Sequence, residues 1–160
     1  MKLFLISLVS LLVDRVIKVL VVRNISLLER VEIIPNFFNL TYVTNEGAAF
    51  SILSGNVLFL IIVSFLALAL IVFYYLFDEN TSNVEKTIIA FLIGGILGNL
   101  YDRIFYGHVV DYLEFIIFGR TFPIFNFADI VIVLSITALC IVTFLKKDDE
   151  DGEVNRGQAV

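Results

Sequence analysis

The sequence alternates between long apolar stretches and shorter segments that carry most of its charged residues. The apolar stretches cover residues 3–22, 57–77, 87–105 and 128–145. Each is close to the roughly 20 residues that a helix needs to cross the hydrocarbon of a bilayer. We therefore predict an all-α membrane protein, a bundle of four transmembrane helices.

The segments between these stretches differ in character. Residues 30–50 are rich in Val, Ile, Phe, Tyr and Thr, with Pro35 and Gly47 as breaks. This pattern predicts a small extracytoplasmic β element between helices 1 and 2. Residues 106–127 are aromatic and are expected to lie along the membrane interface or dip into it, whereas residues 78–85 predict a short polar loop.

The composition agrees with a membrane protein. Hydrophobic residues make up 59% of the chain and charged residues 17%, and the mean hydropathy is +0.97. The formal net charge of −5 arises mainly from an acidic stretch at residues 148–153, so nucleic acid is not a predicted partner. We predict a single transmembrane domain at residues 1–147 and a disordered acidic cytoplasmic tail at residues 148–160.

The chain has a single cysteine, Cys140, and a single histidine, His108. These residues cannot form an internal disulfide or a zinc ligand set, so we predict no metal site of this kind. The first apolar stretch contains charged residues and lacks a small-residue cleavage site, which predicts a retained helix rather than a cleaved leader.

Basic residues near the ends of the helices predict the orientation of the bundle. Lys2, Lys86, Lys146 and Lys147 lie at one end, and Arg23, Arg30 and Arg120 lie at the other. Positive residues favour the cytoplasmic side. This distribution places both termini in the cytoplasm.

Polar residues gather at one face of the predicted bundle. Because the four helices alternate in direction, the end of the first and third and the start of the second and fourth meet at the outer face. The polar residues there are Asp14, Lys18, Asn45, Asn99, Asp102, Arg103, Asp111, Asn126 and Asp129. Charges beside a bilayer are costly unless they are paired or wetted, so this cluster is a candidate functional site.

Some of these residues also fit a purely structural role. Asp14 and Lys18 are four residues apart on a helix, where they can form an ion pair. Asn99, Asp102 and Arg103 have the same kind of spacing and can neutralise one another. For these five residues, scaffold ion pairs are the favoured interpretation.

Two further groups have structural alternatives. Asn126 and Asp129 are placed as an N-cap and its third helical residue at the start of the last helix. Gly94, Gly95 and Gly98 predict close packing between helices rather than a nucleotide loop, because no strand precedes them.

Asp111 is harder to explain structurally. It stands in an apolar segment without an adjacent cation, so the pKa of its carboxyl group is expected to be raised. Two carboxylates at one membrane face share a proton and supply one acid and one base, as in an aspartic protease. A carboxylate-containing transporter and a non-catalytic scaffold remain alternatives at this stage, although the polar residues lie at one face and no repeat is visible.

Five short motifs sharpen this interpretation. They are Asp14-Arg15-Val16-Ile17-Lys18, Asn45-Glu46-Gly47-Ala48-Ala49-Phe50, Gly98-Asn99-Leu100-Tyr101-Asp102-Arg103, Val109-Val110-Asp111-Tyr112 and Phe122-Pro123-Ile124-Phe125-Asn126-Phe127-Ala128-Asp129. In composition and order they resemble the motifs of the bacterial lipoprotein signal peptidases, also called signal peptidase II. The departures are Arg15 and Ile17, which stand where that family often has Gln and Ser or Thr.

The resemblance implies an intramembrane aspartic endopeptidase with Asp111 and Asp129 as the catalytic pair. It implies that Asn45, Gly47, Asn99, Arg103 and Asn126 line or brace the site, while Asp14, Lys18 and Asp102 are structural. The implied substrate is a diacylglyceryl-modified prolipoprotein, cut just before its lipidated cysteine. The implied setting is the bacterial cytoplasmic membrane, with membrane lipid as a partner, a site toward the outer face and no cofactor. The sequence does not define the oligomeric state, and a monomer is the favoured interpretation.

Overall fold

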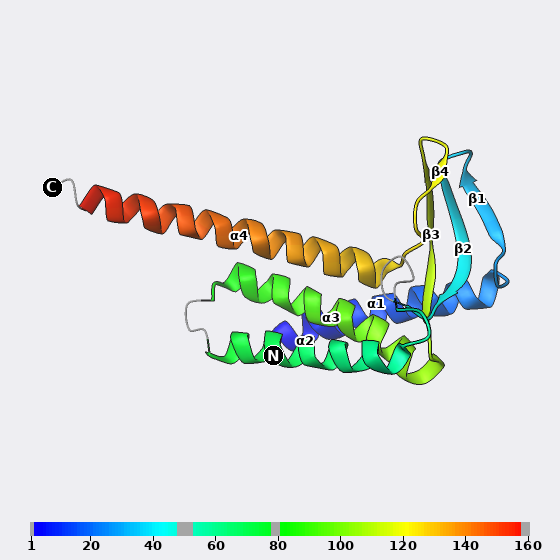
Figure 1. Cartoon of the computed structure of the whole chain (residues 1–160), viewed down its shortest axis with the longest axis horizontal. Coiled ribbons are helices and arrows are strands. Elements are labelled where there is room, and N and C mark those ends of the chain that lie inside the picture. Colours follow the sequence, from blue (N-terminus) through cyan, green and yellow to red (C-terminus); the bar gives the residue numbers. More distant parts are fainter. Residues whose placement is uncertain (1, 48–52, 78–80, 158–160) are drawn as a thin grey trace.

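The computed structural model describes residues 2–47, 53–77 and 81–157, and it contains four long helices and a small sheet (Figure 1). The helices are α1 (Lys2–Asn24), α2 (Val57–Phe77), α3 (Asn83–Tyr106) and α4 (Phe127–Gly157). The strands are β1 (Arg30–Ile34), β2 (Phe38–Asn45), β3 (Val109–Ile117) and β4 (Arg120–Thr121). Each predicted apolar stretch therefore forms a helix, and α2 has the predicted bounds.

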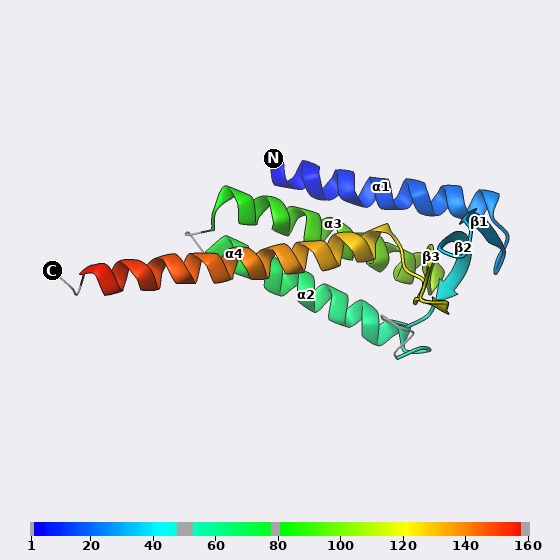
Figure 2. The same ribbon diagram turned by 90° about the horizontal axis from the view of Figure 1, so that it is seen from above.

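The axes of the long helices are roughly aligned, consecutive helices run in opposite directions, and α3 packs against α1, α2 and α4 (Figure 2). Glycines on α3 permit the close approach. A Cβ atom at Gly94 would lie 2.6 Å from Ser10 Cβ, and one at Gly98 would lie 2.6 Å from Asp14 Oδ2. A Cβ atom at Gly95 would lie 3.0 Å from the carbonyl oxygen of Ala128. The prediction that these glycines serve helix packing is confirmed.

Within the described residues, three helices are long and apolar enough to cross a membrane: α2, α3 and the part of α4 up to Lys146. In α1, the charged residues Asp14, Arg15 and Lys18 interrupt the apolar pattern. Three membrane-crossing helices are thus supported by length and composition, and the count of four stays a prediction.

The sheet is larger than the sequence indicates. Its strand order is β1-β2-β3-β4, with all pairs antiparallel. The β element predicted between helices 1 and 2 is present as β1 and β2, but residues 109–117, expected to lie along the membrane interface, form β3 and pair with β2. The predicted helical bundle with a small β element is therefore confirmed, but the all-α description understates the sheet. It has four strands, because hydrogen bonding to β2 satisfies the backbone of this aromatic segment.

Two helix boundaries also differ from prediction. The polar segment 78–85 is predicted to be a loop, but α3 begins at Asn83 with a capping box formed by Ser82 and Glu85; residues 78–80 lie outside the described residues. The acidic residues after 147 are predicted to be disordered, whereas α4 continues as a helix to Gly157 (Figure 1). A helix that is already formed extends at low cost, since each added residue gains one hydrogen bond.

Candidate active site

Strand β3 carries Asp111 to the end of the bundle. Asp111 is paired in register with Val43 of β2, next to a bulge in that strand, and only 2% of its surface is exposed. Its Oδ2 accepts a hydrogen bond from Asn45 Nδ2 at 2.9 Å, and its Oδ1 accepts one from Asn126 Nδ2 at 2.6 Å. The buried carboxylate is therefore held by two side-chain amides from different segments.

Asp129 lies in the first turn of α4, where it belongs to a capping box. Asn126 Oδ1 accepts a hydrogen bond from the backbone N–H of Asp129 at 3.0 Å, and Asp129 Oδ2 accepts one from the N–H of Asn126 at 3.1 Å. The predicted capping relation of these residues is confirmed. The other oxygen of Asp129 accepts from Asn99 Nδ2 at 2.7 Å and is thereby directed toward α3.

Two asparagines connect the carboxylates. Asn126 contacts Asp111 through its side-chain amide and Asp129 through the capping box. Asn99 Oδ1 accepts from Asn126 Nδ2 at 3.2 Å, while the amide nitrogen of Asn99 donates to Asp129. Asp111, Asp129, Asn99 and Asn126 thus form one hydrogen-bonded network, although the sequence separates its members by up to 30 residues.

The environment of Asp111 favours its neutral form. Burial, and after it the negative charge of Asp129, raise the pKa of Asp111 from 3.8 to about 6, while hydrogen bonds from Asn45 and Asn126 oppose this change. The expectation of a raised pKa at Asp111 is confirmed. A carboxyl group that keeps its proton beside a second carboxyl group can serve as an acid.

Three more of the expected site residues adjoin Asp111. Asn45 Oδ1 accepts a hydrogen bond from the backbone N–H of Gly47 at 2.9 Å, and Arg103 Nη2 donates to the carbonyl oxygen of Gly47 at 3.1 Å. This arrangement ties the end of α3 to the segment after β2. The rest of that motif, Ala48-Ala49-Phe50, lies outside the described residues.

A buried ionic cluster on α1 and α3 contacts the network through Asn99. Lys18 Nζ lies 2.9 Å from Asp14 Oδ2 and 2.9 Å from Asp102 Oδ2, and it donates to Asn99 Oδ1 at 2.9 Å. Lys18 is 1% exposed, and neither aspartate is exposed. The predicted Asp14–Lys18 pair is confirmed. Lys18 also reaches the site, because it fixes the oxygen of Asn99 and so directs the amide nitrogen to Asp129.

The predicted neutralisation among Asn99, Asp102 and Arg103 is wrong. Asp102 instead pairs with Lys18 and Arg15, while Arg103 binds the carbonyl oxygen of Gly47. Consecutive helical residues do not face each other, so Asp102 and Arg103 point to different partners.

Arg15 is not among the predicted site residues. It forms an ion pair with Asp102 and lies over the ring of Tyr101, 4.4 Å from its centroid. The sequence shows that Arg15 departs from the motif described above, but it does not reveal that Arg15 contacts Asp102 and Tyr101.

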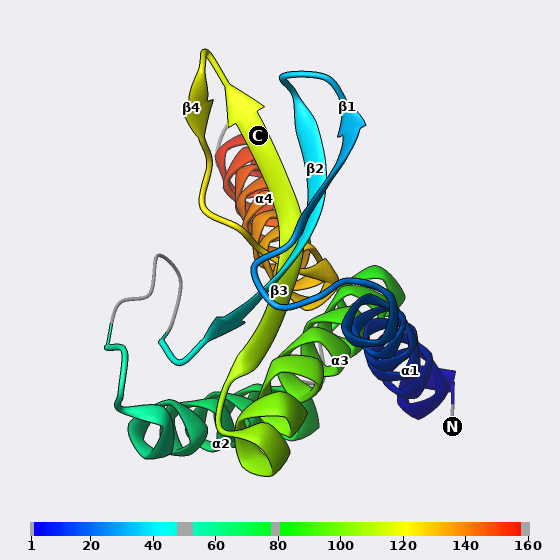
Figure 3. The same ribbon diagram turned by 90° about the vertical axis from the view of Figure 1, so that its right-hand side faces the viewer.

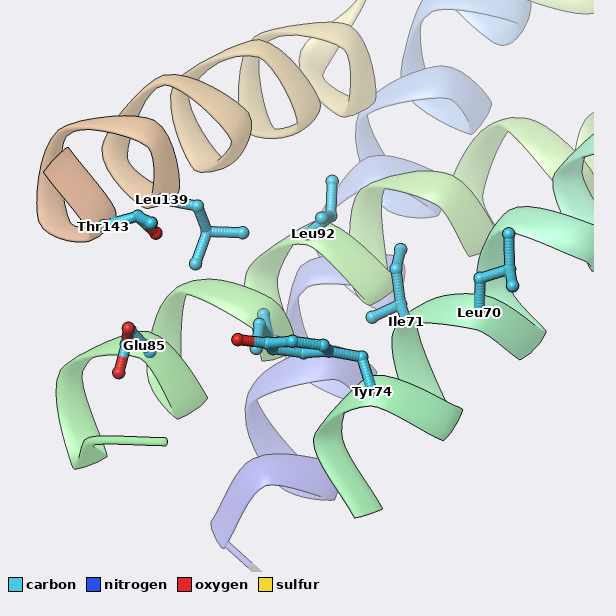
Figure 4. Close-up of a pocket in the computed structure, with 8 residues that line it drawn as sticks. Leu70, Ile71, Tyr74, Glu85, Leu92, Leu139 and Thr143 are labelled. Carbon is cyan, nitrogen blue, oxygen red and sulfur yellow. The ribbon is translucent and has the colours of Figure 1, made fainter. Parts of the chain in front are cut away.

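A pocket also lies away from this network. Figure 4 shows a pocket of about 300 Å³ between α2, α3 and α4, lined by residues that include Tyr74, Glu85 and Leu139. Tyr74 lies near the end of α2 and Glu85 at the start of α3, at the opposite end of these helices from Asp111. Among the described residues, no group of three His, Cys, Asp or Glu side chains is arranged to hold a metal ion.

Comparison with known proteins identifies the family. The sequence model of signal peptidase (SPase) II matches residues 6–145, which include all of the network above. The chain belongs to the signal peptidase II family. Resemblance to this family is predicted from the five motifs, and it is confirmed.

Curated relatives agree with this assignment. The chain is 40% identical over 147 residues to the lipoprotein signal peptidase of Clostridium acetobutylicum, covering 91% of this chain and 96% of the relative. It is 39% identical over 141 residues to that of Staphylococcus aureus, covering 86% of each. Signal peptidase II is a protease family, so the chain is a protease by membership.

Solved structures give the same fold. One bacterial membrane enzyme superimposes with a TM-score of 0.83 at 34% identity and covers 93% of this chain and 90% of its own. A second superimposes with a TM-score of 0.79 at 33% identity, covering 89% of this chain and 92% of its own. The arrangement of helices and sheet described here is therefore shared with solved bacterial membrane enzymes.

Proposed function

We propose that this chain is an intramembrane aspartic endopeptidase whose catalytic pair is Asp111 and Asp129. Its substrate is a prolipoprotein with a diacylglyceryl-modified cysteine, and it cuts the signal peptide just before that residue. The main support for this proposal is that Asn126 forms hydrogen bonds with both carboxyl groups. The name lipoprotein signal peptidase of the relatives supports the choice of substrate.

The roles of the two carboxyl groups differ. Asp111 is buried and has a raised pKa, which suits the member that carries the proton. Asp129 is only partly buried, so it can meet water, and both of its oxygens accept N–H hydrogen bonds. We assign Asp129 as the base and Asp111 as the acid.

The reaction follows from these roles. Asp129 takes a proton from a water molecule, whose oxygen attacks the scissile carbonyl carbon, while Asp111 gives its proton to the carbonyl oxygen. Collapse of the tetrahedral intermediate breaks the C–N bond: the proton held by Asp129 passes to the leaving nitrogen, and Asp111 takes back the proton of one hydroxyl as the new carboxyl group forms. No covalent bond forms between enzyme and substrate.

Other residues are proposed to position the peptide. Arg103 contacts Gly47 through one nitrogen, and its buried Nε has no hydrogen-bond partner among the described residues. That N–H is available to donate to a peptide carbonyl. Asn45 holds both Asp111 and the N–H of Gly47, so it couples the position of this segment to the acid.

The setting is also part of the proposal. Four membrane crossings with both termini in the cytoplasm of a bacterial cell place the carboxylates at the outer face, because Lys2, Lys86 and Lys146 lie at the opposite end of the bundle. The lipid chains of the substrate can then stay in the bilayer beside the site. We propose that the chain acts as a monomer and without a cofactor.

The decisive experiment uses purified protein and a lipidated prolipoprotein in lipid vesicles. Asp111→Asn and Asp129→Asn should each lower turnover by on the order of 10³-fold or more, and the double variant should be little worse, since the residues act as a unit. Glu32→Gln is the matched control, because Glu32 is exposed on β1 and lies outside the site. A folded Asp111→Asn protein with the wild-type rate would show the aspartic mechanism to be wrong.

The substrate is tested separately. The same prolipoprotein without its diacylglyceryl group should be cut poorly or not at all, and the released peptide should end just before the modified cysteine. Equal rates for the two forms would leave the mechanism intact but contradict the proposed role of the lipid.

A further inference from the structure

The far end of the sheet exposes a group of large apolar side chains. Phe118 is 101% exposed, and its neighbours at this end are between 45% and 48% exposed. We call this group the sheet tip; it consists of Ile34, Phe37, Ile117, Phe118 and Phe122. All lie on β1 or β3, in the turns that follow these strands, or directly after β4, outside the candidate membrane-crossing helices. Exposed apolar groups of this kind mark a contact with a partner or a membrane.

The two turns of the sheet bring these side chains together. The ring centroids of Phe37 and Phe115 are 5.6 Å apart, and Ile116 donates its N–H to the carbonyl oxygen of Phe37 at 2.8 Å. The turn between β1 and β2 therefore lies beside the end of β3. Figure 1 shows both turns at the end of the sheet that projects away from the helices.

Phe118 stands in a turn that does not favour it. Phe118 has a φ of 51° and Gly119 a φ of 73°, and they form a two-residue connection between Ile117 and Arg120, which pair across it. Such turns favour Asn-Gly, because both residues need a positive φ. A Phe here carries a conformational cost, and its full exposure brings no packing in return. A residue whose side chain does not suit its local backbone conformation is often found at a functional site.

The sheet is positioned to bring this tip onto a bilayer. Asp111 of β3 contacts Asn126, and the apolar stretch of α4 begins at the next residue, Phe127. The sheet thus leaves the bundle at the level where the membrane-crossing part of α4 starts. Its strands run across the direction of the helices, so the sheet tip projects sideways beyond them (Figures 1 and 3).

We propose that the sheet tip inserts into the surface of the same bilayer that the helices cross. The partner is a phospholipid leaflet, because the tip projects sideways beyond the helices, where lipid surrounds the bundle. Arg120 is exposed two residues after Phe118, at the same turn, and is suited to a lipid phosphate. Insertion would place the apolar groups in the boundary between headgroups and acyl chains, roughly 5–10 Å deep. The sheet, and with it Asp111, would then be fixed in height relative to the membrane.

The chain has no Trp, so a single Trp at the tip is an unambiguous reporter. The experiment uses Phe118→Trp in phospholipid vesicles without substrate. Its fluorescence should shift to the blue, be quenched most by lipids brominated near the headgroup end of the acyl chain, and be shielded from acrylamide in the water. Phe65→Trp, at an exposed position in the middle of α2, is the depth control and should respond most to bromine at the chain end. If acrylamide quenched the Phe118→Trp protein as strongly as free tryptophan amide, and brominated lipid had no effect on it, the proposal would be overturned.

A second pair of variants separates lipid contact from folding. With Phe122→Trp as the reporter, Phe118→Asn should lose most of the quenching by brominated lipid, whereas Phe118→Leu should keep it. Phe118→Asn suits the turn better, so its thermal stability in detergent should be unchanged or higher. Equal quenching in both backgrounds would mean that Phe118 does not hold the tip in the lipid. Neither measurement depends on peptidase activity.

Discussion

The side-chain amide of Asn126 donates to Asp111 at 2.6 Å, while the same residue caps the helix that carries Asp129. One asparagine therefore has two separable functions. Its oxygen starts α4, and its nitrogen binds the carboxylate on β3. Because the two functions use different atoms, different substitutions can remove them independently.

Asn126→Ser should keep the helix cap but lose the amide that reaches Asp111. We expect stability close to that of the wild type, since Ser is a good N-cap, and activity lower by on the order of 10- to 100-fold because Asp111 is no longer held in place. Asn126→Ala should lose both functions and cost about 1 kcal/mol of stability in addition. Thermal unfolding in detergent and turnover of lipidated substrate measure the two effects. Full activity in Asn126→Ser would contradict the positioning role.

The raised pKa of Asp111 makes stability depend on pH. In the unfolded chain its carboxyl titrates near 3.8, and in the folded protein near 6. The folded state binds this proton more tightly, so the stabilisation is complete below about pH 4 and is lost as pH rises through about 6. The difference between the two pKa values corresponds to about 3 kcal/mol.

Asp111→Asn removes this titration and provides the comparison. Unfolding in detergent is measured from pH 4 to pH 7. As the pH rises, the wild type should lose up to about 3 kcal/mol of stability relative to the variant. A difference that stays constant over this range would show that Asp111 titrates alike in both states.

The sequence predicts the helices better than the sheet. An unbroken apolar run defines α2 completely, and its predicted bounds are those observed. The start of α3 is missed because Ser82 and Glu85, which cap it, lie in a polar segment that also suits a loop. Strand β3 is missed because its partner β2 is far away in sequence, and local pattern does not reveal such pairing.

For the site, the sequence indicates which residues gather but not how they contact one another. Alternating helix directions are enough to bring Asp14, Asn99 and Asp129 to one end of the bundle. The contact between Lys18 and Asn99 depends on the close approach of α1 and α3, and the binding of Arg103 to Gly47 depends on the path of the chain after β2. Both are tertiary relations that no spacing along one helix specifies.

The close approach of α1 and α3 is itself testable at the α3 glycines. An added Cβ at Gly98 would meet Asp14 Oδ2 of α1 at 2.6 Å, whereas one at Gly95 faces α4 and would meet its nearest atoms at 3.0 Å. Gly98→Ala should therefore destabilise the protein by about 1–3 kcal/mol, and Gly95→Ala by less. Thermal unfolding in detergent ranks the two variants, and a more stable Gly98→Ala would contradict the observed packing.

The last prediction concerns Lys18, whose ammonium group lies 2.9 Å from both Asp14 and Asp102. Lys18→Met keeps most of the side-chain volume but leaves these buried carboxylates without their shared cation, so we expect a loss of about 3–5 kcal/mol and a low yield of folded protein. Adding Asp14→Asn removes one of the stranded charges, and Asp102 retains Arg15, so the double variant should recover much of the stability. It should not recover full activity, because Asn99 still lacks the donor that directs its amide to Asp129. Unfolding and turnover, measured on the same samples, distinguish the two roles; a double variant that regained both would show that Lys18 serves only the scaffold.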